Sequence, residues 1–314
     1  MTSSSRCLPL LASLLVLLLL GDGLAGPPPA GFDKVIVERD IVYGDAGNRP
    51  LKLDIVRPKK PAESPLPVIA YIHGGGWRAG NKERETVRLL PFAASGNYFC
   101  VSIEYRLSGE AQWPAQIHDC KAAIRWLKAN AGKYGFDPNR IAAWGSSAGG
   151  HLVSLLGTTG DLDQLEGSCG WPDYSTRVKC VVDFSGPSDL TAMLTSPKVT
   201  GNVKRMVTNL LGGPLEERKK EAVAASPMTH VSADDVPILI VQGTKDPLVP
   251  FEQGDLFHKA LKKAGVDSTL IVIQGKDHGS SIRNPEVLKR TGEFFDKHLR
   301  GRNVEISTEP IQGR

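Results

Sequence analysis

The chain of 314 residues has few of the features that mark specialised classes of protein. Its five cysteines are too few for a disulfide scaffold, and their spacings do not match a zinc site. The 38 basic and 34 acidic residues are mixed along the chain, which argues against a nucleic-acid-binding stripe. After the first 25 residues, no apolar run is long enough to cross a membrane. The composition favours one large globular domain.

The N-terminal segment differs from the rest of the chain. Arg6 precedes the apolar run LPLLASLLVLLLL, and the small-residue segment GDGLAG follows it. This order is typical of a secretory signal peptide cleaved near Ala25, with an uncleaved membrane anchor as the alternative. We therefore expect a secreted or periplasmic protein that does not bind a membrane after cleavage. The expected segments are a signal at 1–25, a leader at 26–34, a folded domain at 35–300 and a tail at 301–314.

The remaining cysteines allow one disulfide hypothesis. Export leads to an oxidising compartment, where disulfides persist. Cys100 falls in a strand-like run and Cys120 in a helical pattern, so both are expected to be core thiols. Cys169 and Cys180 flank a polar loop that a disulfide between them could close.

Strand and helix patterns alternate along the chain. The inner strands are nearly continuous apolar runs, which predicts an α/β fold with a mostly parallel, eight-stranded sheet and helices on both faces. An antiparallel pair is expected at the start, and a cap-like insertion is expected at 187–233. The expected strands are 35–44, 51–58, 66–74, 98–107, 140–145, 178–186, 236–243 and 268–275. Sites in such sheets lie beyond the carboxyl ends of the strands.

The most informative stretch is RIAAWGSSAGGHL, where a strand pattern passes into a helix pattern. Gly145, Ser146, Ser147, Ala148 and Gly149 fit the pattern G-x-S-x-G. A nucleophile on such a sharp turn has strained backbone, and its neighbours must be small. Ser147 is the expected nucleophile, whereas a glycine-rich turn with a solvated serine is the alternative.

A serine nucleophile needs a general base and a carboxylate that orients it. Of the seven histidines, His278 directly follows the last expected strand, where a base must lie. Asp246 follows the preceding strand and is the expected orienting acid. Asp277 is a rival, although a sequence neighbour of the histidine usually points away from the required ring nitrogen. The order Ser147, Asp246, His278 is that of α/β-hydrolases.

These residues and their surroundings resemble a known family. The matching blocks are YIHGGGWRAGNK, SIEYRLS, FDPNRIAAWGSSAGGHL, VVDFSGPSDL, HVSADDVPILIVQGTKDPLVP and GKDHG. They are similar to α/β-hydrolases of the esterase and lipase group with an HGGGW loop, especially the bifunctional feruloyl and acetyl-xylan esterase-like family. The resemblance implies oxyanion donors among the N–H groups of Gly75, Gly76 and Trp77, together with that of Ala148.

The expected activity is that of a secreted serine carboxylesterase, which forms an acyl-enzyme on Ser147. The resemblance implies short-chain or aromatic acyl esters, such as acetyl or feruloyl groups on plant polysaccharide, and neither cofactor nor metal. The alternatives are a prolyl-oligopeptidase-type peptidase, an arylformamidase, or a binding protein that keeps the fold without catalysis. Trp77, Trp113 and the insertion at 187–233 are expected to wall a pocket for short or aromatic acids, because the insertion is too polar for a lipase lid.

Overall fold

The computed structural model describes residues 30–47, 49–160, 162–279 and 284–313. The predicted signal peptide and residues 26–29 of the predicted leader lie outside the described residues. Within the described ranges, no helix has both the length and the apolar character that a membrane span requires.

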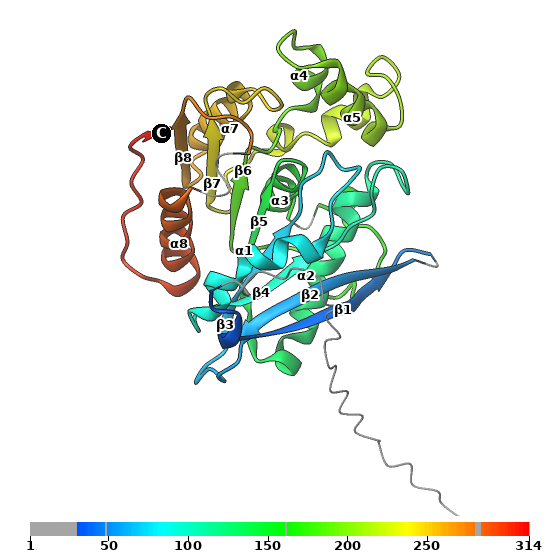
Figure 1. Ribbon diagram of the computed structural model, residues 1–314. Coiled ribbons are helices and arrows are strands. Elements are labelled where there is room, and N and C mark those ends of the chain that lie inside the picture. The colour runs from blue at the N-terminus through cyan, green and yellow to red at the C-terminus, as the bar shows by residue number, and fades with distance from the viewer. Residues whose placement is uncertain (1–29, 48, 161, 280–283, 314) are drawn as a thin grey trace, which may run out of the picture.

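The described chain forms one sheet covered by helices, as Figure 1 shows. The strands are β1 (Val35–Asp45), β2 (Pro50–Pro58), β3 (Leu66–Ile72), β4 (Phe99–Ile103), β5 (Phe136–Ser146), β6 (Cys180–Phe184), β7 (Ile238–Gly243), β8 (Ser268–Gln274) and β9 (Ile311–Gln312). The helices are α1 (Lys82–Ala94), α2 (Ala115–Tyr134), α3 (Ala148–Thr158), α4 (Leu190–Thr195), α5 (Gly201–Leu211), α6 (Lys219–Ala224), α7 (Phe251–Lys263) and α8 (Pro285–Arg300). Short 3₁₀ turns lie at Phe32–Lys34, Asp163–Leu165 and Pro227–His230.

The strand order is β1-β2-β4-β3-β5-β6-β7-β8-β9. β1 pairs antiparallel with β2, and β2 pairs antiparallel with β4, whereas all the other neighbours are parallel. The predicted α/β class and mostly parallel sheet are confirmed. The predicted count of eight strands is wrong, because Ile311 and Gln312 of the expected tail pair with the edge of β8. A strand of two residues carries no periodic pattern that a sequence analysis can detect.

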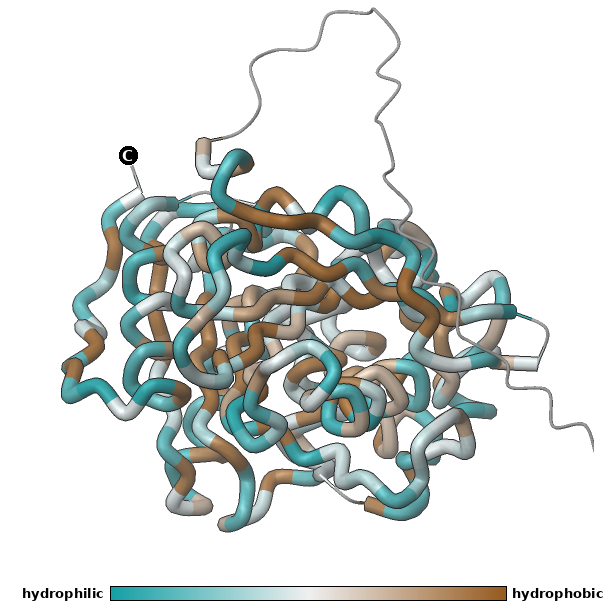
Figure 2. Tube along the Cα trace, turned by 90° about the horizontal axis from the view of Figure 1, so that it is seen from below, coloured by the Kyte–Doolittle hydropathy of each residue, from teal (hydrophilic) through white to brown (hydrophobic). Residues whose placement is uncertain are grey.

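Two hydrophobic layers enclose the sheet. One contains apolar residues of α2, α3 and α7, and the other contains those of α1 and α8. In Figure 2 the apolar strands run through the interior, while hydrophilic residues gather toward the periphery. The helices α4, α5 and α6 belong to the segment between β6 and β7, and Figure 1 shows α4 and α5 side by side, away from the helices that cover the sheet. This segment overlies the end of the sheet where a site is expected.

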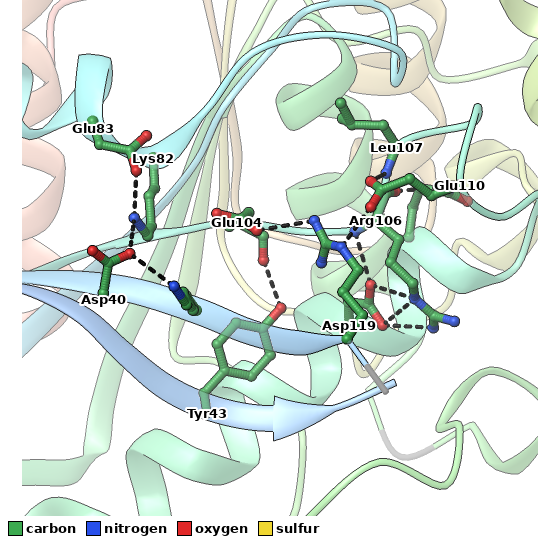
Figure 3. A network of polar contacts seen from close by, with 12 residues as sticks. Asp40, Tyr43, Lys82, Glu83, Glu104, Arg106, Leu107, Glu110 and Asp119 are labelled. Atoms are coloured by element: carbon green, nitrogen blue, oxygen red, sulfur yellow. Dashed lines mark hydrogen bonds and ion pairs between the residues drawn. The ribbon is translucent and has the colours of Figure 1, made fainter. Parts of the chain in front are cut away.

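Ion pairs join the antiparallel strands to the loop that follows β4, as Figure 3 shows. The buried Lys82 Nζ lies 3.0 Å from Asp40 Oδ1, and the Tyr43 hydroxyl donates to the backbone oxygen of Glu104 at 2.5 Å. The Arg106 guanidinium donates to both oxygens of the buried Asp119 carboxylate, at distances from 2.7 to 3.2 Å. Bidentate pairs of this kind fix geometry as well as adding energy. The loop at 104–112 is therefore fastened to α2.

The disulfide hypothesis is wrong. All four cysteines in the described part of the chain are free. Cys180 is fully buried in β6, whereas the Cys169 thiol donates to the backbone oxygen of Asp45 at 3.2 Å. Cys169 and Cys180 flank a loop, but their sulfur atoms do not meet, because β6 directs the Cys180 side chain into the core.

Candidate active site

Ser147 occupies the turn between β5 and α3. Its backbone has φ 56° and ψ −121°, a region that non-glycine residues rarely adopt. The Ser147 N–H donates to Phe184 O at 2.7 Å, and the Ser147 carbonyl accepts from His151 N at 2.9 Å in α3. A strained backbone of this kind persists only where the surrounding structure holds it in place, and here β5, β6 and α3 do so. The serine is thereby held at the N-terminus of a helix, where negative charge is favoured.

The two glycines of the turn are sterically required. A Cβ atom at Gly145 would lie 2.4 Å from Gly149 O, and one at Gly149 would lie 2.1 Å from Ile72 O. Neither backbone oxygen can move without displacing a strand or the helix. The close approach of β3 to the turn is thus the physical reason for the small residues predicted on either side of Ser147.

Ser146 has a different environment from Ser147. Its side chain is largely buried, and Ser146 Oγ accepts a hydrogen bond from the Tyr71 hydroxyl at 3.3 Å. Burial raises the pKa of Tyr71 well above its usual range, so this phenol stays a neutral donor. Ser146 therefore serves the packing between β3 and β5.

Asp246 and His278 meet beyond the ends of β7 and β8. His278 Nδ1 lies 2.7 Å from Asp246 Oδ2, whose side chain is fully buried. Asp246 Oδ1 accepts from the N–H groups of Leu248 and Val249, both at 2.9 Å. A carboxylate held by this many donors is fixed in orientation, and it fixes the histidine ring in turn. The Asp246 carboxylate thus contacts the His278 ring, as expected of an orienting acid.

The HGGGW loop after β3 packs against the serine turn. A Cβ atom at Gly74 would lie 3.3 Å from Ser147 Cβ, and Gly75 and Gly76 have φ values of 116° and 60°. Gly75 O accepts from Arg78 N and Ala79 N at 3.2 and 3.1 Å. The structure records no intrachain hydrogen bond for the N–H groups of Gly75, Gly76 and Trp77 within the described ranges. Ala148, the remaining predicted donor, begins α3, and the first N–H groups of a helix have no partner inside it.

A pocket of about 490 Å³ brings these parts together. Ser147, Ala148, His278 and the HGGGW loop line one side of it. In the described chain no hydrogen bond joins Ser147 Oγ to the His278 ring, although both residues line this pocket. The volume falls within the usual range for small-molecule sites.

Three more lining residues, Met193, Val203 and Met206, lie in the insertion at 187–233 that was expected to wall the pocket. The sequence analysis did not anticipate the others, which include Glu85, Arg88, Leu248 and Val249. Met206 lies directly on the HGGGW loop, since a Cβ atom at Gly76 would be 2.5 Å from its sulfur. The sequence does contain a pattern that predicts helix α5, because Val203, Val207 and Leu210 recur at helical spacing.

The two tryptophans predicted to face substrate differ in their positions. Trp77 belongs to the pocket lining, but its side chain is buried and its indole Nε1 donates to His151 Nδ1 at 3.2 Å. Trp113 does not belong to that lining within the described chain, and it packs in the core with its ring 6.3 Å from that of His151. The placement of Trp113 in the substrate pocket is therefore corrected, because its side chain packs in the core beside His151 and not along the pocket.

The comparisons with known proteins agree with this geometry. The model of the BD-FAE family matches residues 53–261, which is more than half of the chain. The chain belongs to the BD-FAE family. The resemblance found from the sequence motifs is thereby confirmed.

Individual relatives of this BD-FAE chain are esterases by name. It is 37% identical over 227 residues to the probable carboxylic ester hydrolase LipM of Mycobacterium tuberculosis, covering 71% of this chain and 51% of that protein. A truncated carbohydrate esterase from gut microbiota has 30% identity and a TM-score of 0.76, with 87% of this chain and 99% of that chain covered. A butyrate-bound thermophilic esterase from Thermogutta terrifontis has 27% identity and a TM-score of 0.70, covering 88% and 99%. The chain spans about half to two thirds of the length of the curated relatives it matches most strongly.

His151 joins three parts of this BD-FAE site. It lies one turn after Ser147 in α3, accepts from Trp77 of the HGGGW loop, and contacts Ala225 O of the insertion through Nε2 at 2.6 Å. Because Nδ1 accepts, Nε2 must carry the proton that is donated to Ala225 O. This requires the neutral ring, and burial lowers the pKa of His151 to about 4.

The His151 pKa predicts an acid-dependent loss of stability. An unfolded histidine titrates near pH 6.5, so the stabilisation from the neutral buried ring is complete above that pH and is lost as pH falls toward 4. Between pH 7 and pH 5, the wild type should lose about 2 kcal/mol of unfolding free energy relative to His151→Gln. Urea denaturation of both proteins at the two pH values measures this difference. Equal pH dependence in the two proteins would show that His151 is not titrating as described.

Proposed function

We propose that this chain is a serine carboxylic-ester hydrolase in which Ser147 is the nucleophile, His278 the general base and Asp246 the acid that orients His278. The observation that carries the proposal is the hydrogen bond between Asp246 and His278. His278 and the strained Ser147 turn line the same pocket. A fluorophosphonate probe tests it, because an activated serine attacks the phosphorus and displaces fluoride, whereas a solvated serine is left unchanged. Peptide mapping should locate the label on Ser147.

In this mechanism His278 Nε2 takes the proton of Ser147 as Oγ attacks the ester carbonyl. The proton then passes to the leaving alcohol, and a water activated by His278 releases the acid. The N–H groups of Gly75, Gly76, Trp77 and Ala148 stabilise the negative charge on the carbonyl oxygen.

The acyl group that suits the pocket is short. The wall that faces the serine consists of side chains from the insertion, Met193, Val203 and Met206, together with Leu248 and Val249 after β7. Apolar side chains favour a hydrocarbon acyl group, and we expect the insertion to close the pocket over a short one. The butyrate bound to the Thermogutta terrifontis esterase supports the same range of length.

A series of nitrophenyl esters should therefore give the highest kcat/KM from acetate to butyrate, with a steep fall beyond about eight carbons, because a closed pocket rejects additional methylenes sterically. Met206→Ala should move the optimum to longer chains by removing the side chain that lies on Gly76. Met228→Ala is the matched control, since Met228 lies in the same insertion but outside the pocket lining. Rising turnover toward palmitate in the wild type would instead identify a lipase.

The proposed natural substrates are acetyl or feruloyl esters on plant polysaccharide. The carbohydrate esterase from gut microbiota, which matches along almost its full length, supports this class. A panel of acetylated xylan, methyl ferulate, nitrophenyl acetate and aminoacyl amides separates it from the peptidase alternative. We also propose export through the signal at 1–25, which the N-terminal sequence of the mature protein tests directly.

A further inference from the structure

A second hollow, the side groove, lies next to the acyl pocket. It has a volume of about 480 Å³ and is lined by Arg78, Ser108, Gln112, Thr208 and Asn209, with three glycines. All five named side chains are polar, in contrast to the apolar wall of the acyl pocket. The two hollows therefore suit ligand groups of different chemistry.

The side groove and the acyl pocket share residues and elements. Arg78 lines both of them and directly follows the HGGGW sequence. The Ser108 N–H donates to Trp77 O at 2.7 Å, which joins the groove wall to the HGGGW loop. Helix α5 carries Met206 to the pocket and Asn209 to the groove. A single ester with its acyl group at Ser147 can thus place its alcohol in the groove.

The backbone around the groove is held firmly. The Trp113 N–H donates to Leu210 O at 2.8 Å, which ties the loop at 104–112 to the end of α5. Gly212 has φ 81°, and a Cβ atom there would lie 2.1 Å from Gln112 Oε1, so the glycine lets the Gln112 amide pack against the helix end. Together with the Arg106–Asp119 ion pair, these contacts fix the walls before any ligand arrives.

The polar side chains of the groove are available for a ligand. The side chains of Arg78, Gln112 and Asn209 are exposed, and within the described ranges no hydrogen bond or ion pair is recorded for them. The two amides each offer a donor and an acceptor, and the guanidinium offers donors only. A groove with a firmly held backbone and exposed donors and acceptors matches an alcohol with several hydroxyl groups, because hydroxyls both donate and accept.

We propose that the side groove binds the saccharide part of the ester through Gln112, Asn209 and Arg78. This inference rests on the proposed function, since it assigns the leaving alcohol of that reaction. Ser147 Oγ adds to the acyl carbon, and the bond between that carbon and the sugar oxygen breaks when the resulting tetrahedral intermediate collapses. The Ser147 proton, carried by His278, ends on the sugar oxygen, and the free saccharide leaves through the groove.

Two acetyl esters of ring alcohols test the proposal, a methyl xyloside monoacetate and cyclohexyl acetate, since only the first has free hydroxyls. The ratio of their kcat/KM values should favour the xyloside in the wild type and fall about tenfold in the Gln112→Ala/Asn209→Ala double variant. Asn202→Ala is the control, because Asn202 is exposed on α5 and lines neither hollow. An unchanged ratio in the double variant, or an equal fall in the control, would overturn the proposal.

Binding of xylotriose separates failure of the groove from failure of the proposed function. In the Ser147→Ala background, calorimetry should detect xylotriose binding that weakens at least fivefold when Gln112 and Asn209 are both replaced by alanine. If the wild type hydrolyses no ester, including nitrophenyl acetate, the proposed function is wrong, but the binding result still decides the groove. Equal binding with and without the two side chains would place the saccharide elsewhere.

Discussion

Ser147→Ala should lower kcat for ester hydrolysis by a factor on the order of 10⁶, the size of effect seen when a serine hydrolase loses its nucleophile. Binding and the oxyanion donors remain in this variant, so KM should change little and a small residual rate should persist. The substitution removes only the side-chain hydroxyl from the strained turn. The two backbone hydrogen bonds of the turn, from Ser147 N to Phe184 O and from His151 N to Ser147 O, are unaffected. The variant should therefore fold normally, and steady-state kinetics with nitrophenyl acetate measure the loss.

Ser146→Ala is the matched control for this experiment. Ser146 stands next to the nucleophile, but its hydroxyl makes a hydrogen bond with Tyr71 inside the sheet. Loss of one such bond costs about 1 kcal/mol of stability and should leave most of the activity. A fluorophosphonate probe should label Ser146→Ala and fail to label Ser147→Ala. The reverse pattern would mean that the nucleophile has been placed on the wrong serine.

Asp246→Asn should lower kcat by about 10³ to 10⁴ while the fold is kept. Asp246 Oδ1 accepts from two backbone N–H groups, so an asparagine keeps its oxygen there and turns its NH₂ group toward His278 Nδ1. That nitrogen must then accept, which moves the ring proton to Nε2, the atom required to take the proton of Ser147. The loss should appear in kcat far more than in KM, because substrate does not contact Asp246.

Asp277→Asn provides the comparison for Asp246→Asn, since Asp277 is the sequence neighbour of His278. Its replacement should change kcat only mildly, because the His278 ring takes its carboxylate contact from Asp246. Both variants should have the thermal stability and circular dichroism of a folded protein. Comparable losses of kcat at the two positions, or a loss only at Asp277, would contradict the assignment of Asp246.

The prediction from sequence was most accurate where local patterns decide the structure. Continuous apolar runs indicated parallel strands, and the helix patterns between them indicated the order of the layers. The positions directly after strands pointed to Ser147, Asp246 and His278, because the carboxyl ends of parallel strands meet at one edge of a sheet. The roles of these residues remain proposals, although the structure gathers all of them around one pocket.

The errors occurred where a residue's surroundings come from distant parts of the chain. Trp113 follows a strand and looks like a pocket residue, yet its side chain packs in the core beside His151 of α3. Cys180 and Cys169 are close in sequence, but the direction of β6 turns one thiol into the core. The strand β9 exists only because β8 leaves an edge for it.

By itself, the sequence determined the class of fold, the serine turn, and the two loops that carry Asp246 and His278. Backbone sterics and the period of apolar residues act over a few positions, so they can be read without knowledge of the fold. Only the tertiary structure decided that His278 contacts Asp246, that Met206 lies on Gly76, and that polar residues of two distant segments form the side groove. These contacts depend on how whole elements pack, and many side-chain arrangements are compatible with the same local pattern.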